Sequence, residues 1–547
     1  MTKQHAPDSQ RPWSVKGVGP GDTQPLDQGL RVWGTSLGNA PWVWAVLCLM
    51  AMGLLRWVTL NWHPVGLHFD EAQYWLWSQQ LDWGYYSKPP VIAALIAVST
   101  DFFGDGTNGV RALSMGCWLL TAGLLIKLGE WMHSIRAGLW ACALFSVTPA
   151  ANLLGLVATT DAPLLLGWTT TMALTWWVCI RQTSRLGYRA FLPWVTLGLA
   201  WGLTMNAKYT AAVLAPSLLL VVWLSIRNGS KDASKPTWFG LGLAVLVAVF
   251  CLIPNLMWNA QHEWPTLQHT LDITWRTQDV VKTGAMASPW LRLAHLVGGV
   301  LLLCGPALLA VALIKLLATR FQNQATNSNS NWVFDTVNPA TWAAMFVWPL
   351  CAVGVLQALL GGSQVNWLAP VLPGLCLMAA IFWVNTPAPQ WGVRVVLLAM
   401  VGSVALSTWV GASTDLRLQT LSKQVTNKPL DFWHKARHWP MVLRELEPWV
   451  ADHPRPIWTA ERDVFVQTAY AWRNLSPTLQ SYSATGQVRH HFDLFYPTKS
   501  EAGAVFWLDR SPPPQSMGEQ YKFEKLAISE HGGLRLELWL LTPLKGL

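Results

Sequence analysis

A short segment after the first apolar run carries charged residues that are unusual so close to a membrane. Asp70 and Glu71 form a carboxylate pair, and Lys88 stands directly before two prolines that restrict the backbone. Charge at the centre of a membrane helix costs about 2.5–3.5 kcal/mol, so charges near spans usually have a function. A restrained lysine suits an anionic ligand, whereas the alternative interpretation is an ordinary interfacial loop with solvated acids and a Trp/Tyr belt.

Two further charged residues precede or follow apolar runs on the same predicted side. Asp161 lies in Thr-Thr-Asp-Ala-Pro at the start of an apolar run. It could cap a helix, with Pro163 in the first turn, or it could point into the same outer cavity as Asp70. Lys208 lies in a tight turn between two apolar segments, where it could also serve as an interfacial anchor.

Two histidines, His262 and His269, are candidates for a divalent metal site together with outer carboxylates. Their spacing does not match a zinc-binding motif such as HExxH, and the alternative is that both histidines have a structural role. The chain also lacks GxxxxGK[ST], GxGxxG and GxSxG motifs, which argues against an ATPase or a Rossmann enzyme.

The composition indicates a polytopic α-helical membrane protein. Of 547 residues, 52% are hydrophobic and only 12% are charged, against about 25% charged in soluble domains. A spanning helix needs about 20 apolar residues, and the chain offers about 11 or more such segments. We place them near 41–60, 109–130, 137–151, 163–180, 191–206, 209–226, 237–257, 291–314, 338–360, 366–385 and 393–411. Segment 91–103 is too short and is expected to lie along the membrane surface or to form part of a split span.

The distribution of Lys and Arg between the spans predicts the orientation. Most of them fall on the side of the N-terminus, so the positive-inside rule places that end in the cytoplasm. Because the basic residues are dispersed, nucleic acid is not an expected partner. We predict a cytoplasmic tail over 1–40, a transmembrane catalytic domain over 41–411 with its first outer loop at 61–108, and a small periplasmic α/β domain over 412–547.

The α/β prediction for the C-terminal region rests on its changed pattern. Residues 428–452 read as helical, with a break at Pro440. Short apolar runs at 456–459, 504–508 and 534–541 are typical of strands, and 461–472 reads as a helix.

Several motifs together resemble the bacterial polyprenyl-phosphate-sugar transferases. These enzymes have the C-type glycosyltransferase fold and are related to the protein O-mannosyltransferases and the lipid A aminoarabinose transferase. The resemblance runs in order through about 41–385. The motifs are Asp70-Glu-Ala-Gln-Tyr-Trp, Gly84-Tyr-Tyr-Ser-Lys-Pro-Pro, Phe103-Gly-Asp, Thr160-Asp-Ala-Pro, Ala207-Lys-Tyr-Thr and Val365-Asn-Trp-Leu-Ala-Pro.

The resemblance implies roles for individual residues. Asp70 matches the essential carboxylate of the first loop, and Asp161 matches a second carboxylate of the active cavity. Lys88 matches the lysine that contacts the lipid-linked phosphate, and Lys208 lies in the matching turn. Substrate contacts are also expected from Glu71, Tyr85 and Tyr86.

Cofactor use is less defined by the resemblance. The metal-binding histidine of the aminoarabinose transferases has no secure match, although His262 and His269 are candidates. Ser87 stands where those enzymes carry a glutamate, so no cofactor is certain and a divalent metal ion is one option.

The expected function is therefore that of a glycosyltransferase of the bacterial inner membrane. It would move a sugar, with inversion, from a polyprenyl-phosphate carrier to an envelope acceptor: a glycolipid, a polysaccharide or a protein. Membrane lipids, the donor and the acceptor are the expected partners. The alternatives are a transporter or flippase of a lipid-linked saccharide, and a non-catalytic assembly factor.

Overall fold

The computed structural model describes most of the chain and divides it into two compact units, Met1–Cys48 and Leu49–Leu547. The predicted tail over 1–40 lies outside the described residues. The second unit contains all the described helices and strands except the start of the first helix, which begins at Pro41. The described residues are 41–62, 65–181, 191–228, 238–275, 288–325, 338–360, 364–385, 389–412, 433–499 and 503–544.

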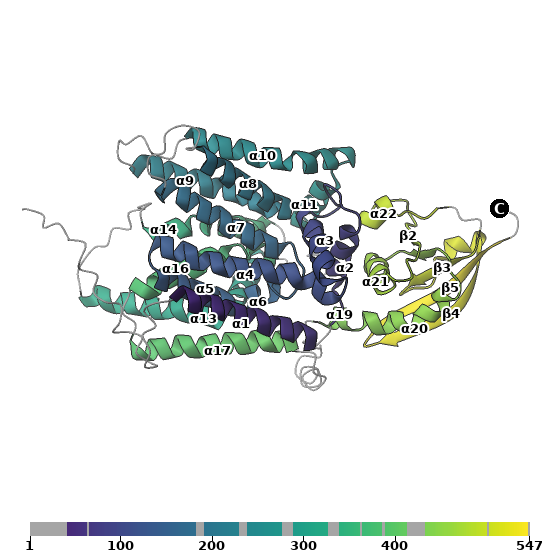
Figure 1. Cartoon of the computed structure of the whole chain (residues 1–547). Coiled ribbons are helices and arrows are strands. Elements are labelled where there is room, and N and C mark those ends of the chain that lie inside the picture. Colours follow the sequence, from purple (N-terminus) through teal and green to yellow (C-terminus); the bar gives the residue numbers. More distant parts are fainter. Residues whose placement is uncertain are drawn as a thin grey trace, which may run out of the picture. The chain divides into compact units, whose positions relative to one another are not determined.

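Apolar helices make up the larger part of this unit, as a polytopic membrane protein requires (Figure 1). Within the described ranges, 5 helical segments are long and apolar enough to cross a membrane. They are Thr107–Met132, Tyr209–Arg227, Trp238–Gln261, Pro289–Leu317 and Pro339–Leu360. The helices of this region are α1 (Pro41–Trp62), α4 (Thr107–Met132), α5 (Ile135–Val147), α6 (Pro149–Leu154), α7 (Asp161–Trp176), α8 (Leu192–Ala207), α9 (Leu214–Asn228), α10 (Trp238–Gln261), α11 (Pro265–Trp275), α13 (Pro289–Ala325), α14 (Pro339–Ala344), α15 (Trp348–Leu360), α16 (Val371–Asn385) and α17 (Gln390–Ala412).

Glycine determines how some of these helices pack and bend. A Cβ on Gly138 of α5 would overlap the carbonyl oxygen of Ile126 on α4, so only glycine allows this close approach. In α13, Gly305 has a φ of 70° and is followed by Pro306. The helix therefore breaks its regular backbone at this point and continues in a new direction.

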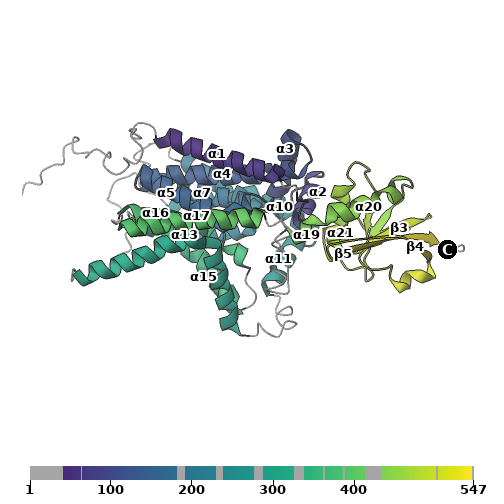
Figure 2. The ribbon, with the colours of Figure 1, turned by 90° about the horizontal axis from the view of Figure 1, so that it is seen from below.

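The predicted first outer loop is largely helical. It contains α2 (Phe69–Ser78) and α3 (Val91–Phe103), which lie between the long helices and the C-terminal α/β segment in both views (Figures 1 and 2). α2 begins with a capping box: the His68 ring nitrogen Nδ1 accepts from the Asp70 backbone N–H, and the Glu71 carboxylate accepts from the His68 backbone N–H. This places Asp70 in the first turn of a helix rather than in a flexible loop.

The C-terminal segment forms a five-stranded sheet in the order β2-β1-β3-β5-β4. β1 (Ile457–Thr459) runs parallel to β2 (Leu479–Ser481) and β3 (Val505–Asp509). β5 (Leu534–Pro543) is antiparallel to β3 and β4 (Tyr521–His531). The helices of this segment are α19 (His434–Arg437), α20 (Trp439–Ala451), α21 (Arg462–Ala471) and α22 (His491–Phe495).

The structure contains the elements that the sequence predicts for this segment, and two further strands. The strands expected near 456–459, 504–508 and 534–541 are present, and so is the helix expected at 461–472. Pro440 lies in the first turn of α20, where a proline is tolerated, so the predicted break precedes it. The predicted boundary at 412 coincides with the end of α17, and residues 413–432 lie outside the described ranges.

α21 connects the sheet to the first outer loop. Its Val464 packs with α20 and with sheet residues such as Phe506, whereas Phe465 and Tyr470 pack against α2. Two faces of this short helix are therefore buried, and its N-terminus is held close to the start of α2.

Candidate active site

A cavity of about 300 Å³ gathers the charged residues that the sequence singled out. Asp70, Glu71, Lys88, Asp161 and Lys208 all line it, although they come from separate segments of the chain. The other lining residues are His68, Tyr74, Val157, Ala158, Thr159, Thr160, Asn366, Trp367, Trp433 and Ala436.

Asp70 offers an accessible carboxylate at this cavity. Its side chain is 41% exposed, and Arg462 of α21 lies beside it, with Nη2 3.4 Å from Oδ1. His68 is the other neighbour, with Nδ1 3.7 Å from Oδ2. The carboxylate is thus oriented by side chains on two sides and remains open to a ligand.

Glu71, next in the sequence, is completely buried and has protein partners on both oxygens. Arg111 of α4 donates to it twice, at 2.8 and 2.7 Å, and the backbone N–H groups of Ala158 and His68 donate at 2.8 and 2.9 Å. Burial raises the pKa of Glu71, but Arg111 and the hydrogen bonds outweigh burial, so its pKa is lowered. Glu71 therefore joins α2 to α4 and to the segment before α7, and its oxygens are already occupied.

Lys88 is held in a tight turn. The backbone N–H of Tyr85 donates to the carbonyl of Lys88 at 3.1 Å, and the N–H of Lys88 donates back to Tyr85 at 3.4 Å. Among the described residues, no hydrogen bond or ion pair is made by its ammonium group. Burial lowers the pKa of Lys88 to about 8, as does nearby Lys208, while Asp70 and Asp161 oppose this. A partly buried cation without a side-chain partner at a cavity wall is a suitable group for binding an anion.

Asp161 and Lys208 form an ion pair across the same cavity. Lys208 Nζ lies 2.7 Å from Asp161 Oδ1, and their side chains are 12% and 7% exposed. Asp161 is the first residue of α7, whereas the N-cap position belongs to Thr160. Asp161 was expected either to cap a helix or to point into the cavity. It lines the cavity, and the N-cap position lies one residue earlier, at Thr160. Lys208 has an extended backbone and separates α8 from the 3-10 helix Tyr209–Val213.

Tyr85 and Tyr86, which were expected to contact substrate, make other contacts in the structure. Tyr85 is buried, stacks on Trp77 at 4.5 Å, and donates to the Trp77 or Gln80 carbonyl, at 3.1 or 3.2 Å. The ring of Tyr86 lies 5.5 Å from that of His269. Neither tyrosine is among the described residues that line this cavity or the neighbouring cavity beside Lys88 and Lys208.

The described residues do not fit a metal site. No group of three His, Cys, Asp or Glu side chains with metal-binding geometry occurs among them. His262 Nδ1 lies 2.8 Å from the Trp258 carbonyl oxygen, and its ring stacks on Trp258 at 4.3 Å. His269 is separate and lines a second cavity.

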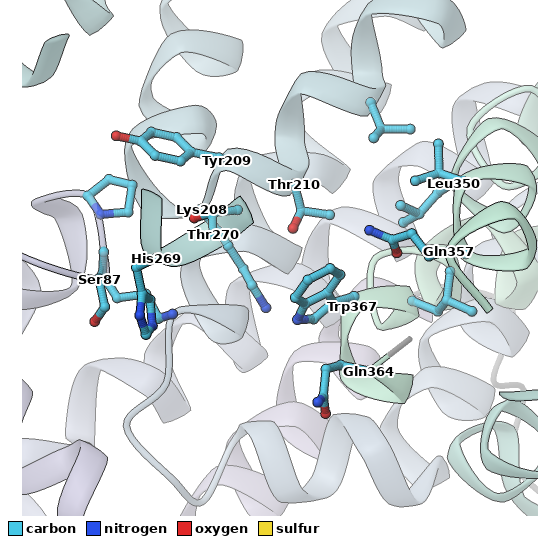
Figure 3. Close-up of a pocket in the computed structure, with 16 residues that line it drawn as sticks. Ser87, Lys208, Tyr209, Thr210, His269, Thr270, Leu350, Gln357, Gln364 and Trp367 are labelled. Atoms are coloured by element: carbon cyan, nitrogen blue, oxygen red, sulfur yellow. The ribbon is translucent and has the colours of Figure 1, made fainter. Parts of the chain in front are cut away.

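That second cavity, of about 220 Å³, adjoins the first because Lys88, Lys208 and Trp367 line both. Figure 3 shows the residues that line the second cavity, with Lys208 and Trp367 among them. Its wall is mixed. The apolar part includes Pro89, Val213, Leu350, Val353 and Leu368, and the polar part includes Thr210, His269, Thr270, Gln357 and Gln364. The two lysines thus stand at the junction of a charged chamber and a more apolar one.

Some residues of the site were not singled out by the sequence. Arg111 falls at the start of the span predicted near 109–130, and Arg462 falls in the helix predicted at 461–472. Both form pairs with residues far away in the chain, so no local pattern could reveal them. Asn366 and Trp367, which also line the cavity, could have been predicted, because they belong to the Val365-Asn-Trp-Leu-Ala-Pro motif of the family resemblance.

Comparisons with known proteins agree with this architecture. Residues 87–258 match the profile of the dolichyl-phosphate-mannose-protein mannosyltransferase family. Lipid A galacturonosyltransferase RgtD of Rhizobium johnstonii is 31% identical over 231 residues, which are 42% of this chain and 46% of that relative. The chain thus spans less than half of that relative.

Two further similarities extend over nearly the whole chain. The undecaprenyl phosphate-alpha-4-amino-4-deoxy-L-arabinose arabinosyl transferase 2 of Pseudomonas fluorescens is 22% identical, over 90% of this chain and 91% of its own length. The crystal structure of ArnT from Cupriavidus metallidurans bound to undecaprenyl phosphate has a TM-score of 0.59 at 14% identity, covering 90% of this chain and 97% of that one. The chain is therefore a membrane protein with the C-type glycosyltransferase fold of ArnT, and its sequence is similar to the aminoarabinose transferases and, over residues 87–258, to the protein mannosyltransferases.

Proposed function

We propose that this protein transfers a sugar from a polyprenyl-phosphate carrier to an envelope acceptor. The observation that carries the proposal is the cavity in which the unpaired ammonium of Lys88 and the accessible carboxylate of Asp70 are both present. The names of two relatives, a lipid A galacturonosyltransferase and an undecaprenyl-phosphate aminoarabinose transferase, support this class of donor and a glycolipid acceptor.

The donor phosphate would lie at the junction of the two cavities. Lys88 and Lys208 line both chambers, and the second chamber has the apolar side chains that a polyprenyl chain needs. When the bond between the sugar and the phosphate breaks, negative charge grows on the leaving phosphate. A preorganised ammonium group beside that phosphate stabilises the transition state more than the ground state.

The acceptor would approach from the side of Asp70. An acceptor oxygen attacks the anomeric carbon, the bond from that carbon to the phosphate oxygen breaks, and polyprenyl phosphate leaves with the electron pair. Asp70 accepts the proton of an acceptor hydroxyl, a role typically worth about 10²–10⁴ in rate. Direct in-line attack inverts the anomeric centre. If the acceptor oxygen belongs to a phosphate, no base is required and Asp70 orients the sugar.

The orientation of the chain fits a lipid-linked donor. We place the N-terminus in the cytoplasm, about 11 spans in the membrane, and the 412–547 region with the cavity on the extracytoplasmic side of the inner membrane. Nucleotide sugars do not reach that side, so a carrier lipid is needed there.

The test is a turnover assay in proteoliposomes. The purified protein is supplied with undecaprenyl phosphate-aminoarabinose or with polyprenyl phosphate-galacturonic acid, together with lipid A. Release of polyprenyl phosphate and the mass of lipid A are followed. With the wild type, we expect polyprenyl phosphate to be released and the mass of lipid A to increase by the transferred sugar. We expect Asp70→Asn to reduce turnover at least about 100-fold. Asp101→Asn, which alters an exposed carboxylate of the same outer region, is the matched control.

Two results would contradict the proposal. Full turnover by Asp70→Asn would remove the catalytic assignment of that residue. Movement of the intact donor across the bilayer, with its sugar–phosphate bond unbroken, would instead identify a flippase.

A further inference from the structure

Arg462 reaches the candidate active site from the C-terminal α/β segment. It is the first residue of α21, and its Nη2 lies 3.4 Å from Oδ1 of Asp70. Its guanidinium carbon also lies 4.8 Å from the centre of the Phe69 ring. Two consecutive residues of α2 therefore hold this guanidinium by an ion pair and a cation–π contact.

The helix that carries Arg462 is fixed to the first outer loop. Gln467 Nε2 donates to the Leu67 carbonyl at 2.7 Å, and the hydroxyl of Tyr470 donates to the Asp105 carbonyl at 3.0 Å. The bond from Gln467 is buried and lies three residues before Asp70 in the loop. Arg462 is thus presented by a docked helix, and its position relative to Asp70 is defined by more than its own side chain.

The acidic neighbours of Arg462 have a different partner. Glu461 and Asp463 flank it in the sequence, and both pair with Arg510, whose Nη2 lies 2.5 Å from Asp463 Oδ2. Arg510 directly follows β3. Because Arg510 occupies the two adjacent carboxylates, Arg462 pairs across the interface with Asp70 instead.

We propose that Arg462 is a positioning residue for Asp70. It acts through Asp70 by holding the carboxylate in the orientation that accepts the acceptor proton, and this role rests on the proposed transferase function. The pair is partly exposed, with side chains 32% and 41% accessible. Such pairs contribute little to stability, so loss of the guanidinium should disturb the orientation of Asp70 much more than the fold.

The experiment compares Arg462→Gln, Arg462→Lys and Arg462→Gly in the same proteoliposome assay. We expect Arg462→Gln to lower kcat roughly tenfold to a hundredfold, as for a displaced catalytic group, with the donor KM and the melting temperature near wild type. Arg462→Lys should recover part of kcat. Free guanidinium chloride at millimolar concentration should restore Arg462→Gly and should not restore Asp70→Asn.

Arg473→Gln is the matched control. Arg473 follows the other end of α21 and packs over the Tyr470 ring at 4.6 Å, away from Asp70. We expect it to keep the wild-type kcat. The inference is overturned if Arg462→Gln keeps full kcat, if Arg473→Gln loses as much, or if guanidinium fails to restore Arg462→Gly. A wild type that releases no polyprenyl phosphate would overturn the proposed function and this inference with it.

Discussion

Asp161 and Lys208 are 47 positions apart in the sequence and meet at 2.7 Å. The pair joins the first residue of α7 to the residue that follows α8. Both side chains are mostly buried, so each charge depends on the other for compensation. The position of Lys208 at the junction of the two cavities is therefore set by Asp161.

Removal of either partner should destabilise the protein. Asp161→Asn or Lys208→Met leaves one buried charge without its counter-ion, which typically costs about 3 kcal/mol or more. The double variant removes both charges, so we expect its melting temperature to fall by less than the sum of the two single losses. Thermal unfolding in detergent measures this double-mutant cycle. Additive losses would show that the two residues are not coupled.

Donor use should depend on pH through Lys88. Its pKa of about 8 means that the free protein keeps the ammonium below that pH and loses it as the pH rises through that value. We expect kcat/KM for the donor to fall above about pH 8. Lys88→Arg keeps its charge and should lose this basic limb. Lys88→Met should weaken donor use about 10- to 100-fold at pH 7, the value of a charge-assisted hydrogen bond. An unchanged basic limb in Lys88→Arg would point to another group.

Glu71 should matter for stability rather than for substrate affinity. Glu71→Gln leaves Arg111 buried with a weaker partner, and we expect a loss of about 3–5 kcal/mol. Since the pKa of Glu71 is lowered in the folded protein, its stabilisation is present above its unfolded pKa and is lost as the pH falls through the folded pKa. Melting curves at several pH values test this. Glu130→Gln disrupts the more exposed Lys127 pair and should cost at most about 1 kcal/mol.

Tyr85→Phe should affect the turn that holds Lys88. The lost hydroxyl donates to the carbonyl of Trp77, in the last turn of α2, or to that of Gln80, and it accepts from the Asp82 N–H at 3.1 Å. Loss of these hydrogen bonds should cost about 1–3 kcal/mol of stability. We expect a lower melting temperature and a higher donor KM, because the turn ends at Lys88. Tyr482→Phe, in the α/β segment, should leave the donor KM unchanged. A variant of Tyr85 with wild-type stability and altered sugar preference would show direct substrate contact instead.

The charged part of the site was predictable because its residues lie in short motifs beside spans. Asp70, Lys88, Asp161 and Lys208 each stood next to an apolar segment on one predicted side, so the fold had only to bring those ends together. Their convergence in one cavity agrees with that interpretation. The roles of the individual residues remain predictions.

The partners of these residues could not be predicted in the same way. Arg462 is 392 positions from Asp70, and Arg111 is 40 from Glu71, so neither pair has a local signature. Tyr85 was expected to contact substrate because aromatic side chains can stack on a sugar, and that contact stays a prediction. Its buried hydroxyl bond to the Trp77 carbonyl could not be foreseen, because aromatic side chains also pack in protein cores. Strands β2 and β4 also escaped prediction: β2 has three residues, and β4 carries charges without regular alternation.

The shared wall of the two cavities has a consequence for the end of the reaction. Lys88, Lys208 and Trp367 contact both chambers, so the groups that would bind the phosphate are present whether or not a sugar is attached. After transfer, the carrier lipid keeps its phosphate and its polyprenyl chain, and it has lost only the sugar, which would occupy the charged chamber. Polyprenyl phosphate should therefore inhibit the enzyme in competition with the donor. The rate of turnover in the cell would then depend on how fast the carrier is removed and recycled.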